Sequence, residues 1–301
     1  MKGTQFPAQS LVPSGAASVV AVVLNWCAEE LTSECIDSLE CSQYSRSRIL
    51  LIDNGSPDGS GERLHARFPT IPYLQMSRNL GYGVANNRGI EWALAHRADY
   101  VLVVNNDAVV LPEAIGLLVE AAESGEEVAI VAPFIGYHDD PETAWYAGGQ
   151  FSRLRGLGVH RAPRPAEGLT KAEEVSFASG CVCLISARAI RDVGTFAEDF
   201  FSYVEDAEFC VRLRRAGYRI LFEPRARALH RTPRLEHDPA PYKIRLRDRN
   251  RRRVMRRHFG PLVRIPFLAR FYVTRLILLL RYSARLDWPR ATAVVQGMVE
   301  R

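Results

Sequence analysis

The segment Tyr-Val-Leu-Val-Val-Asn-Asn-Asp, residues 100–107, begins as an apolar run and ends in three polar side chains. A short run of Val and Leu is typical of a strand that is buried on both faces of a parallel sheet. Similar runs lie before and after it, and segments with a helical spacing of apolar residues separate them. This alternation predicts an α/β fold, in which helices flank a mostly parallel central sheet.

The same periodicity places the other elements. Strands are expected at 19–24, 49–53, 73–76, 100–105 and 128–132, and helices at 29–39, 59–68, 83–96 and 112–124. Residues 136–174 are rich in Gly, Pro and Arg, which predicts loops and short strands. Regular structure is expected again at 175–186, then a helix at 187–193, a helix that contains Phe209, Leu213 and Ala216, and a short strand at 219–222.

Composition limits the class of protein. The 301 residues are 47% hydrophobic, which is enough to bury one large core. The formal net charge is +5, and nearly all of the excess lies between Tyr242 and Arg257. The six cysteines have no CxxC spacing, which predicts reduced thiols in a cytosolic protein. No segment reaches the roughly 20 apolar residues of a spanning helix, so we expect no transmembrane segment.

Polar side chains gather where the expected strands end. They are Asn25, Asp53, Arg78, Asn79, Asn105, Asn106 and Asp107. Each group alone also fits an ordinary polar turn or helix cap. Ligands of open α/β sheets bind beyond the carboxyl ends of the strands, so the shared position predicts a binding site there.

Four motifs, read in order, make the pattern specific. They are IDNGSPDGS from residue 52, RNLGYGVANNRG from residue 78, VLVVNND from residue 101, and the run from FASGC at residue 177 to ARALH at residue 230. In this order and at these separations the chain resembles the family-2 glycosyltransferases with the GT-A fold. Within that family it is similar to the bacterial rhamnosyltransferase-like branch. The resemblance covers Val19 to His230.

The resemblance implies a site for a nucleotide-diphosphate sugar. Asp53 would hydrogen-bond the donor base, and Asn25 would line the same pocket. Arg78 and Asn79 would lie near the ribose and phosphates, with Asn106 also on the donor side. The branch favours dTDP-L-rhamnose, although a UDP-sugar also fits, because a hydrogen bond from Asp53 suits thymine and uracil alike.

A divalent cation, Mg²⁺ or Mn²⁺, is implied at the diphosphate. Asp107 corresponds to the last acid of the family's DxD-like motif, and His230 matches a histidine that completes the metal or diphosphate site. The first position of the motif is Asn105, so one carboxylate stands where the family usually has two. Hard oxygen ligands are the ones that such cations prefer.

The acceptor side of the site is implied by a second pair of acids. Asp206 matches the catalytic base, with Glu205 beside it, and Gly180 would form the floor of the acceptor site. Asp206 would take the proton of an acceptor hydroxyl during a single displacement, so the anomeric configuration would invert. A glycan or lipid-linked acceptor is implied. Both acids also fit a helix N-terminus without any catalytic role.

Three other classes of protein share parts of this pattern. The Gly81-Tyr82-Gly83 run lacks the third glycine of a dinucleotide-binding fingerprint, since Asn86 takes its place. A nucleotidyltransferase would need a loop rich in Gly and Arg after the first strand, where this chain has Leu24 to Cys27. A non-catalytic sugar-nucleotide-binding or membrane-associated scaffold protein remains open, because Asn105 replaces the first acid.

The predicted organisation is a GT-A catalytic domain at 1–235 and a basic, amphipathic helical region at 236–301. The nucleotide half of the domain would span about 17–133 and the acceptor half about 134–235. The C-terminal region includes two basic and apolar segments, residues 245–258 and 264–286. Their composition fits helices that lie on an anionic membrane at its cytoplasmic face. It fits equally well a pair of packed helices with solvated arginines. The absence of an aromatic platform beside the arginines argues against nucleic acid.

Overall fold

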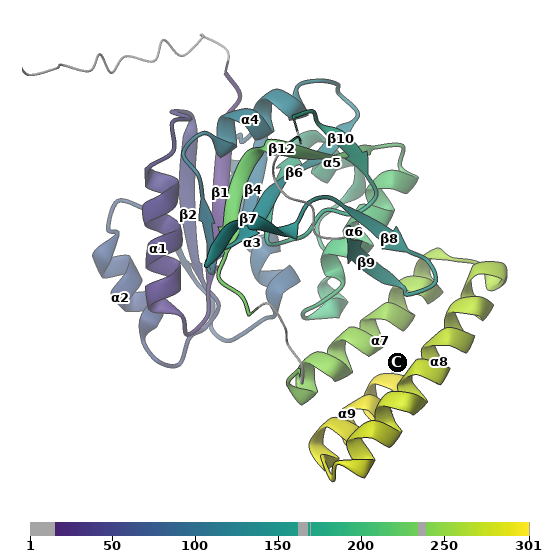
Figure 1. The fold of residues 1–301 in the computed structure, drawn as a ribbon. Helices are drawn as coiled ribbons and strands as arrows, with labels where there is room; N and C mark the ends of the chain where they lie inside the picture. Colours follow the sequence, from purple (N-terminus) through teal and green to yellow (C-terminus); the bar gives the residue numbers. More distant parts are fainter. Residues whose placement is uncertain (1–15, 162–167, 169, 234–238, 301) are drawn as a thin grey trace, which may run out of the picture.

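A mixed β-sheet forms the centre of the molecule (Figure 1). The computed structural model describes residues 16–161, 168, 170–233 and 239–300. In this part of the chain the sheet order is β10-β12-β6-β11-β4-β1-β2-β3, with β5 paired to β12 and β7 paired to β6. The strands are β1 (Val19–Asn25), β2 (Ser47–Asp53), β3 (Tyr73–Gln75), β4 (Tyr100–Asn105), β5 (Ala108–Val110), β6 (Val128–Tyr137), β7 (Asp140–Tyr146), β10 (Glu173–Val175), β11 (Val182–Ser186) and β12 (Arg219–His230).

The first half of the sheet is parallel. β1 pairs in parallel with β2 and β4, and Asn25 lies opposite Asp53 where the strands end. β11 then runs antiparallel between β4 and β6, so the polar end of β4 faces the start of β11. This arrangement brings the ends of β1, β2 and β4 to one edge of the sheet, as the sequence predicts.

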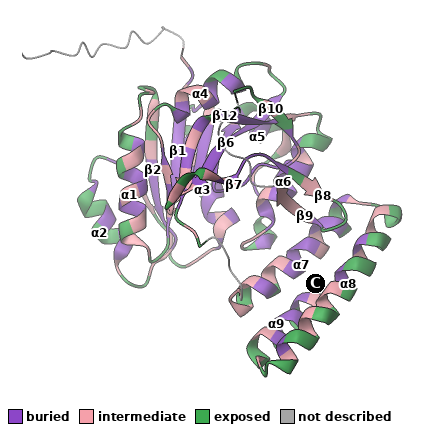
Figure 2. Ribbon diagram, in the orientation of Figure 1, coloured by how far each residue is buried: buried purple, intermediate pink, exposed green. Residues whose placement is uncertain are grey.

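Helices cover the sheet and its ends. They are α1 (Glu29–Glu40), α2 (Ser60–Arg67), α3 (Tyr82–Ala95), α4 (Ala114–Ala122), α5 (Ala187–Val193) and α6 (Glu205–Arg215), with a 3₁₀ turn η1 (Glu198–Phe200) before α6. A two-stranded sheet of β8 (Gly149–Ser152) and β9 (Leu157–His160) lies apart from the main one. Figure 2 shows buried residues concentrated in the strands of the central sheet.

The core consists of the apolar strands and the helix faces against them. Val22, Val103 and Leu184 have no exposed surface or almost none. The third helix approaches β1 closely because Gly89 faces the strand: a Cβ atom there would lie 2.4 Å from a methyl group of Val22. The runs of Val, Ile and Leu that predict the strands are therefore the residues that build the core.

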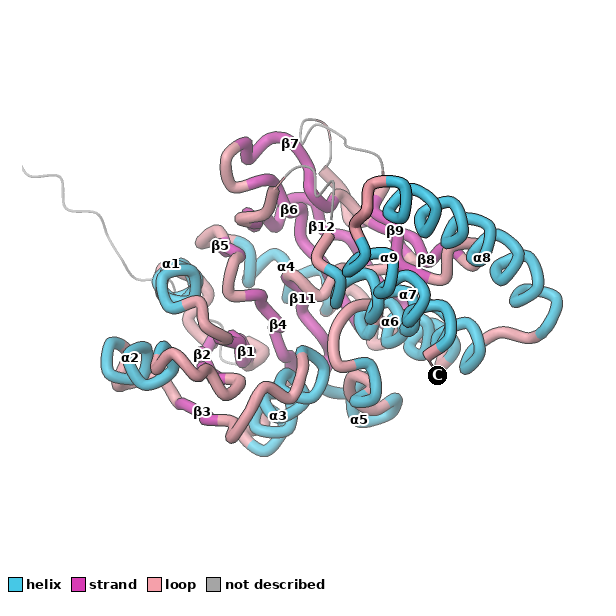
Figure 3. Tube along the Cα trace, turned by 90° about the horizontal axis from the view of Figure 1, so that it is seen from below, coloured by secondary structure: helices cyan, strands magenta, loops and turns pink. Residues whose placement is uncertain are grey.

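The C-terminal residues form a layer of three helices beside the sheet (Figures 1 and 3). They are α7 (Pro241–His258), α8 (Pro261–Ala284) and α9 (Trp288–Val299). Apolar contacts of Met255 with Phe267 and Phe271, and of Ile244 with Val294, hold them together. No helix of the described chain has both the length and the apolar composition to cross a bilayer. The predicted domain boundary at 235 lies outside the described residues.

Three expected elements differ from the structure by several residues. The strand expected at 128–132 continues to Tyr137 as β6. The segment 175–186 is divided into β10 and β11, and residues 176–181 connect the two strands. The short strand expected at 219–222 continues to His230. A register shift between Glu223 and Arg227 carries the strand past Pro224. A bulge of this kind lets a strand continue where a charged residue and a proline suggest its end.

Candidate active site

A cleft of about 960 Å³ opens at the edge of the sheet where the strands end. Its lining comes from four places: the ends of β1 and β4, Asn54 with the segment 79–82, the loop 201–203, and the first turns of α7. The polar and aromatic lining residues are Trp26, Asn54, Asn79, Tyr82, Asn105, Asn106, Asp107, Phe201, Ser202, Tyr203, Tyr242, Arg245 and Arg249. The cleft is large enough for a nucleotide sugar, since ligand pockets usually measure about 300–1,000 Å³.

Asp107 lines one wall of this cleft and contacts His230, which does not itself line the cleft. The Oδ2 atom of Asp107 lies 3.2 Å from the Nε2 atom of His230. The strand pairing explains the contact, because His230 at the end of β12 lies opposite Ala108 of β5. The ring of Trp145 packs edge-on against the imidazole at 4.3 Å between centroids and fixes its orientation. Residues 123 positions apart are thus brought to one place, as the family resemblance implies.

The donor atoms of this wall fit a divalent cation. Asp107 Oδ1, His230 Nδ1 and Asn105 Oδ1 are buried and have no hydrogen-bond partner in the described chain. Buried polar atoms are rarely left unpaired, so such a group calls for an ion or another partner. A carboxylate with an imidazole suits Mn²⁺, and the carboxylate and amide oxygens suit Mg²⁺.

Cys181 is a third group at this wall that the sequence did not indicate. A ligand atom of Cys181 lies within 4.8 Å of those of Asp107 and His230. Burial, followed by the charge of Asp107, raises the pKa of the Cys181 thiol well above its ordinary value. Sulfur is a soft ligand, whereas Mg²⁺ and Mn²⁺ prefer oxygen ligands, so Asp107 and His230 suit such a cation better than Cys181 does.

Asp53 and Asn25 lie beneath the cleft. Both are fully buried. The Asp53 carboxylate accepts hydrogen bonds from the side chains of Asn25 at 2.7 Å, Ser56 at 2.6 Å and Gln75 at 2.7 Å. The Ser56 N–H donates a fourth, at 2.9 Å. A donor base could therefore reach Asp53 only by displacing a present partner, and the exposed Gln75 side chain is the most accessible one.

A line of hydrogen bonds joins this buried pair to the cleft wall. Asn106 donates through Nδ2 to the Thr32 hydroxyl at 3.0 Å, and that hydroxyl lies 2.8 Å from Asn25 Oδ1. Asn25 in turn donates to Asp53. Polar groups at the ends of β1, β2 and β4 are thereby held in one network, which favours a rigid donor side.

The segment after β3 enters the cleft at Asn79. The Asn79 Oδ1 atom accepts from the Asn54 amide at 3.1 Å and from the Gly81 N–H at 2.9 Å. Gly81 has φ of +86°, and a Cβ atom there would lie 2.3 Å from the Phe201 carbonyl oxygen, so only glycine fits. Arg78 is exposed and does not line the cleft.

The loop before α6 has an unusual backbone. Phe201, Tyr203 and Val204 have φ of +61°, +70° and +74°, in the region that side-chain-bearing residues rarely adopt. Each such conformation costs on the order of 1–3 kcal/mol and persists only where the surroundings hold it. The loop leads directly into Glu205 and Asp206, the first residues of α6. Strain of this kind is common at functional sites.

Asp206 is held by backbone donors beside the cleft. Its Oδ2 atom accepts from the Gly180 N–H at 3.1 Å and its Oδ1 atom from the Ala207 N–H at 2.7 Å. The Gly180 carbonyl accepts from the hydroxyl of Tyr82, which lines the cleft. A Cβ atom on Gly180 would lie 3.1 Å from that hydroxyl and 3.4 Å from Asp206 Cβ. Gly180 therefore permits the close packing of Tyr82 and Asp206.

The two acids of α6 differ in protonation. Burial, and next the charge of Asp206, raises the pKa of Glu205 to about 8, and its Oε2 atom has no partner in the described chain. Burial also raises the pKa of Asp206, but hydrogen bonds from Gly180 and Ala207 oppose that effect. Near neutral pH Asp206 is the member of the pair that carries the charge, because only its carboxylate has two backbone donors.

The fourth wall of the cleft was not foreseen. Tyr242, Arg245, Leu246 and Arg249 come from α7, which the sequence places outside the catalytic domain. Arg245 and Arg249 pair with Glu300 at the end of the chain, at 2.6 and 3.3 Å. The basic composition of α7 is the only signal of this wall in the sequence. That composition is also compatible with a membrane-binding helix or with a packed helix that has solvated arginines.

Solved structures of similar fold include two that hold nucleotides and Mn²⁺. GalNAc-T7 bound to UDP, GalNAc and Mn²⁺ aligns with a TM-score of 0.65 at 16% identity, over 81% of this chain and 48% of that one. The mannosyltransferase PcManGT from Pyrobaculum calidifontis, bound to GDP-Man and Mn²⁺, aligns with a TM-score of 0.57 at 14% identity, over 96% and 88%. These likenesses confirm the predicted GT-A fold.

Sequence comparison gives nearer relatives. The chain is 32% identical over 206 residues to the N-acetylglucosaminyl-diphospho-decaprenol L-rhamnosyltransferase of Mycobacterium tuberculosis. This alignment covers 60% of this chain and 66% of that protein. It is 29% identical over 182 residues to the low-salt glycan biosynthesis hexosyltransferase Agl10 of Haloferax volcanii, over 59% of this chain and 58% of that one. The sequence model of glycosyl transferase family 2 matches residues 18–194, more than half of the chain, and the chain belongs to this family.

Proposed function

We propose that this chain is an inverting glycosyltransferase that moves a sugar from a nucleotide-diphosphate donor to an acceptor hydroxyl. The observation that carries the proposal is the convergence on one cleft of Asp107, which contacts His230, and the loop before Asp206. Family membership and the TM-scores to nucleotide-bound transferases support it. Such a transfer needs two parts. Polar groups must hold the donor in place, and a separate acid must accept the proton of the acceptor hydroxyl.

The proposed chemistry divides the work among these residues. Asp107 and His230 would hold a Mg²⁺ or Mn²⁺ ion with the donor diphosphate, and the cation would supply positive charge to the departing group. Asp206, fixed by the N–H groups of Gly180 and Ala207, would accept the proton of the acceptor hydroxyl. Attack from the side opposite the diphosphate needs no protein nucleophile and inverts the anomeric carbon.

A rhamnosyl donor and a lipid-linked acceptor are the favoured substrates. The mycobacterial relatives are named for L-rhamnosyl transfer to N-acetylglucosaminyl-diphospho-decaprenol. We therefore propose dTDP-L-rhamnose ahead of a UDP-sugar. The acceptor would be a glycan or a lipid-linked sugar. Asp53 and Asn25 would take part in base binding after Gln75 moves away from the Asp53 carboxylate.

The test is a donor panel with and without metal. The chain is incubated with dTDP-L-rhamnose, UDP-sugars and GDP-mannose, in Mg²⁺, Mn²⁺ or EDTA, with a synthetic diphospholipid acceptor. We expect product and nucleoside diphosphate only with metal, and a product linkage opposite in configuration to the donor. Donor alone at 100 times its Kd should stabilise the fold by about 2.7 kcal/mol. Binding without turnover would favour the non-catalytic scaffold, and retention of configuration would contradict the single displacement.

We further propose that α8 lies on the surface of an anionic membrane. Six large apolar side chains are more than half exposed along it: Leu262, Ile265, Val273, Leu276, Ile277 and Leu280. They extend over about 27 Å of helix. The helix carries four arginines and no acid, and of these Arg275 is bound to Asp248. An apolar stripe with cationic neighbours matches helices that rest in the headgroup region.

The arginines of α7 have other partners. Arg249 and Arg253 donate to the carbonyls of Phe200 and Asp199, and Arg251 pairs with Asp248. Helix α7 is therefore a packed helix whose arginines bind other parts of the protein, and the membrane proposal rests on α8. Such a position at the cytoplasmic face would bring the cleft near a lipid-linked acceptor.

Vesicle co-sedimentation tests this location. We expect the chain to sediment with vesicles containing anionic lipid, and the double variant Leu276→Glu, Ile277→Glu to stay in solution. Leu154→Glu is the matched control, because Leu154 is 49% exposed but lies on the β8–β9 turn. Equal binding by neutral vesicles, or unchanged binding by the double variant, would contradict the proposal.

A further inference from the structure

One face of α7 packs along the segment that carries the two acids. The residues on this face are Arg249, Asn250, Arg253, Arg257 and His258, which recur at helical spacing. All of them bond to residues between Asp199 and Glu208. The family match ends at residue 194, before both the acids and this helix.

Asn250 makes the central contacts of this face. Its side-chain amide donates to the carbonyls of Phe200 at 2.9 Å, Ser202 at 2.9 Å and Tyr203 at 2.8 Å. The side chain is fully buried. Two amide hydrogens thus serve three carbonyls, which must all point inward toward α7. A loop with successive positive φ angles is the backbone that turns its carbonyls this way.

The opposite side of the loop is held by α3. The Tyr82 N–H donates to the Phe201 carbonyl at 2.6 Å, and Gly81 lets the two backbones approach. All four carbonyls from Phe200 to Tyr203 therefore have a donor from α3 or α7. The strained backbone persists because these donors are fixed.

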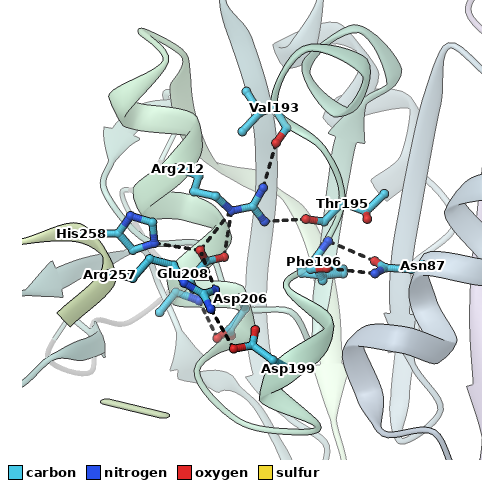
Figure 4. Close-up of polar contacts among 11 residues, drawn as sticks. Asn87, Val193, Thr195, Phe196, Asp199, Asp206, Glu208, Arg212, Arg257 and His258 are labelled. Atoms are coloured by element: carbon cyan, nitrogen blue, oxygen red, sulfur yellow. Dashed lines mark hydrogen bonds and ion pairs between the residues drawn. The ribbon is translucent and has the colours of Figure 1, made fainter. Parts of the chain in front are cut away.

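A second set of contacts fixes the helix that follows the loop. Figure 4 shows Arg212, Arg257 and His258 converging on Glu208. His258 Nε2 lies 2.8 Å from Glu208 Oε1, and Arg212 Nε lies 2.9 Å from Oε2. Burial alone would raise the pKa of Glu208, but the hydrogen bond from His258 and the charge of Arg212 outweigh it and lower that pKa. Glu208 lies two residues after Asp206, and its charged carboxylate connects α6 to the end of α7.

We propose that Asn250 is a positioning residue, which holds the loop 200–204 so that Asp206 faces the acceptor in the cleft. The inference rests on the proposed transferase reaction for its effect on rate, but its structural part does not. Asn250 would touch neither substrate nor metal. Helix α7 is on this account a working part of the catalytic unit, since it lines the cleft and also sets the loop that presents the base.

The test compares variants of two buried residues of α7 in the full chain. Asn250→Asp keeps the shape but places an oxygen against three carbonyls, and Asn250→Ser is too short to reach them. Asp248→Asn is the matched control: Asp248 is buried and pairs with Arg251 and Arg275, away from the loop. Hydrogen exchange of residues 200–206, kcat and donor KM are measured for each.

We expect faster exchange at 200–206 in both Asn250 variants and a kcat lowered about 100-fold, the loss typical of a displacement near 1 Å. Donor KM should change less than threefold, and Asp248→Asn should lower Tm yet leave kcat and loop exchange unchanged. Unchanged kcat in the Asn250 variants, or an equal loss in Asp248→Asn, would overturn the inference. If one Asn250 variant does not fold, the other decides. If the wild-type chain transfers no sugar, the proposed function fails, and unaltered loop exchange would separately refute the positioning role.

Discussion

Replacing Asp206 by Asn should abolish transfer while the donor still binds. General base catalysis contributes about 10²- to 10⁴-fold, so we expect kcat to fall by that factor. The corresponding loss is about 2.7–5.4 kcal/mol of transition-state stabilisation, at about 1.36 kcal/mol for each factor of ten. The donor should bind normally, because Asp107, His230 and Asn106 lie on other elements of the cleft.

The structure also predicts a change in stability for this variant. The Asp206 oxygens face two N–H donors, from Gly180 and Ala207. An asparagine offers one oxygen, so its amide group must face one of these N–H groups. The unpaired donor should cost about 1–3 kcal/mol of folding free energy. Urea unfolding measures that loss, and assays should be run well below the midpoint of both proteins.

The assay measures product by chromatography and donor affinity by calorimetry. Asp206→Ala is a useful companion, since it removes the base without placing a donor against Gly180. Both variants should lose transfer and retain donor affinity within about threefold, which is about 0.7 kcal/mol. Turnover near the wild-type rate in either one would refute the assignment of the base. A parallel loss of donor affinity would instead place Asp206 in the donor site.

Three further outcomes are expected. The pKa of Glu205 is about 8 in the folded chain, against an ordinary value of 4.5. The protonated side chain therefore contributes fully to stability below pH 4.5, and this contribution is lost as the pH rises through 8. The Tm of Glu205→Gln should therefore rise relative to the Tm of the wild type as the pH is raised from 5 to 9. A Tm difference that stays constant over this range would contradict the raised pKa of Glu205. Gly180→Ala should lower kcat about tenfold without lowering Tm, because its Cβ would crowd Tyr82 and Asp206 by a few tenths of an ångström. Gly89→Ala should destabilise the fold by about 1–3 kcal/mol in urea unfolding by pressing on Val22, whereas Gly116→Ala, with no atom closer than 3.7 Å, should not.

Much of the sheet could be predicted because its strands are apolar runs bounded by polar turns. The strand at 100–105 was predicted with its observed bounds, and the run of β1 to within one residue. The end of β12 could not be predicted in this way. Glu223 and Pro224 resemble a turn, yet Glu223 is buried and bound to Arg225, and the strand continues to His230.

The site was predicted in part, for reasons that differ by residue. Asp107 follows an apolar strand, so its place at the sheet edge follows from the sequence. His230 was found only through the resemblance, since its contact with Asp107 depends on the bulge in β12. Asp53 was expected to meet the donor base, and the structure places it below the cleft with four hydrogen bonds. Its role remains a prediction.

The role of α7 could not be predicted from the sequence. Asn250 donates hydrogen bonds to backbone carbonyls. Every residue has such a carbonyl, so the sequence of the loop does not indicate these contacts. The loop 201–204 has no glycine to signal its positive φ angles, since Phe201, Tyr203 and Val204 adopt them. The arginines of α7 were visible as charge, but their partners, such as Glu300 and Asp199, are known only from the fold.

Crystals soaked with Mn²⁺ and a nucleotide-diphosphate sugar, with data collected at the manganese absorption edge, would locate the cation and the donor. We expect one anomalous peak within about 2.5 Å of ligand atoms of Asp107 and His230, in contact with the diphosphate, and the sugar facing Asp206. A manganese peak at another surface, or a donor bound with its sugar pointing away from Asp206, would contradict this expectation.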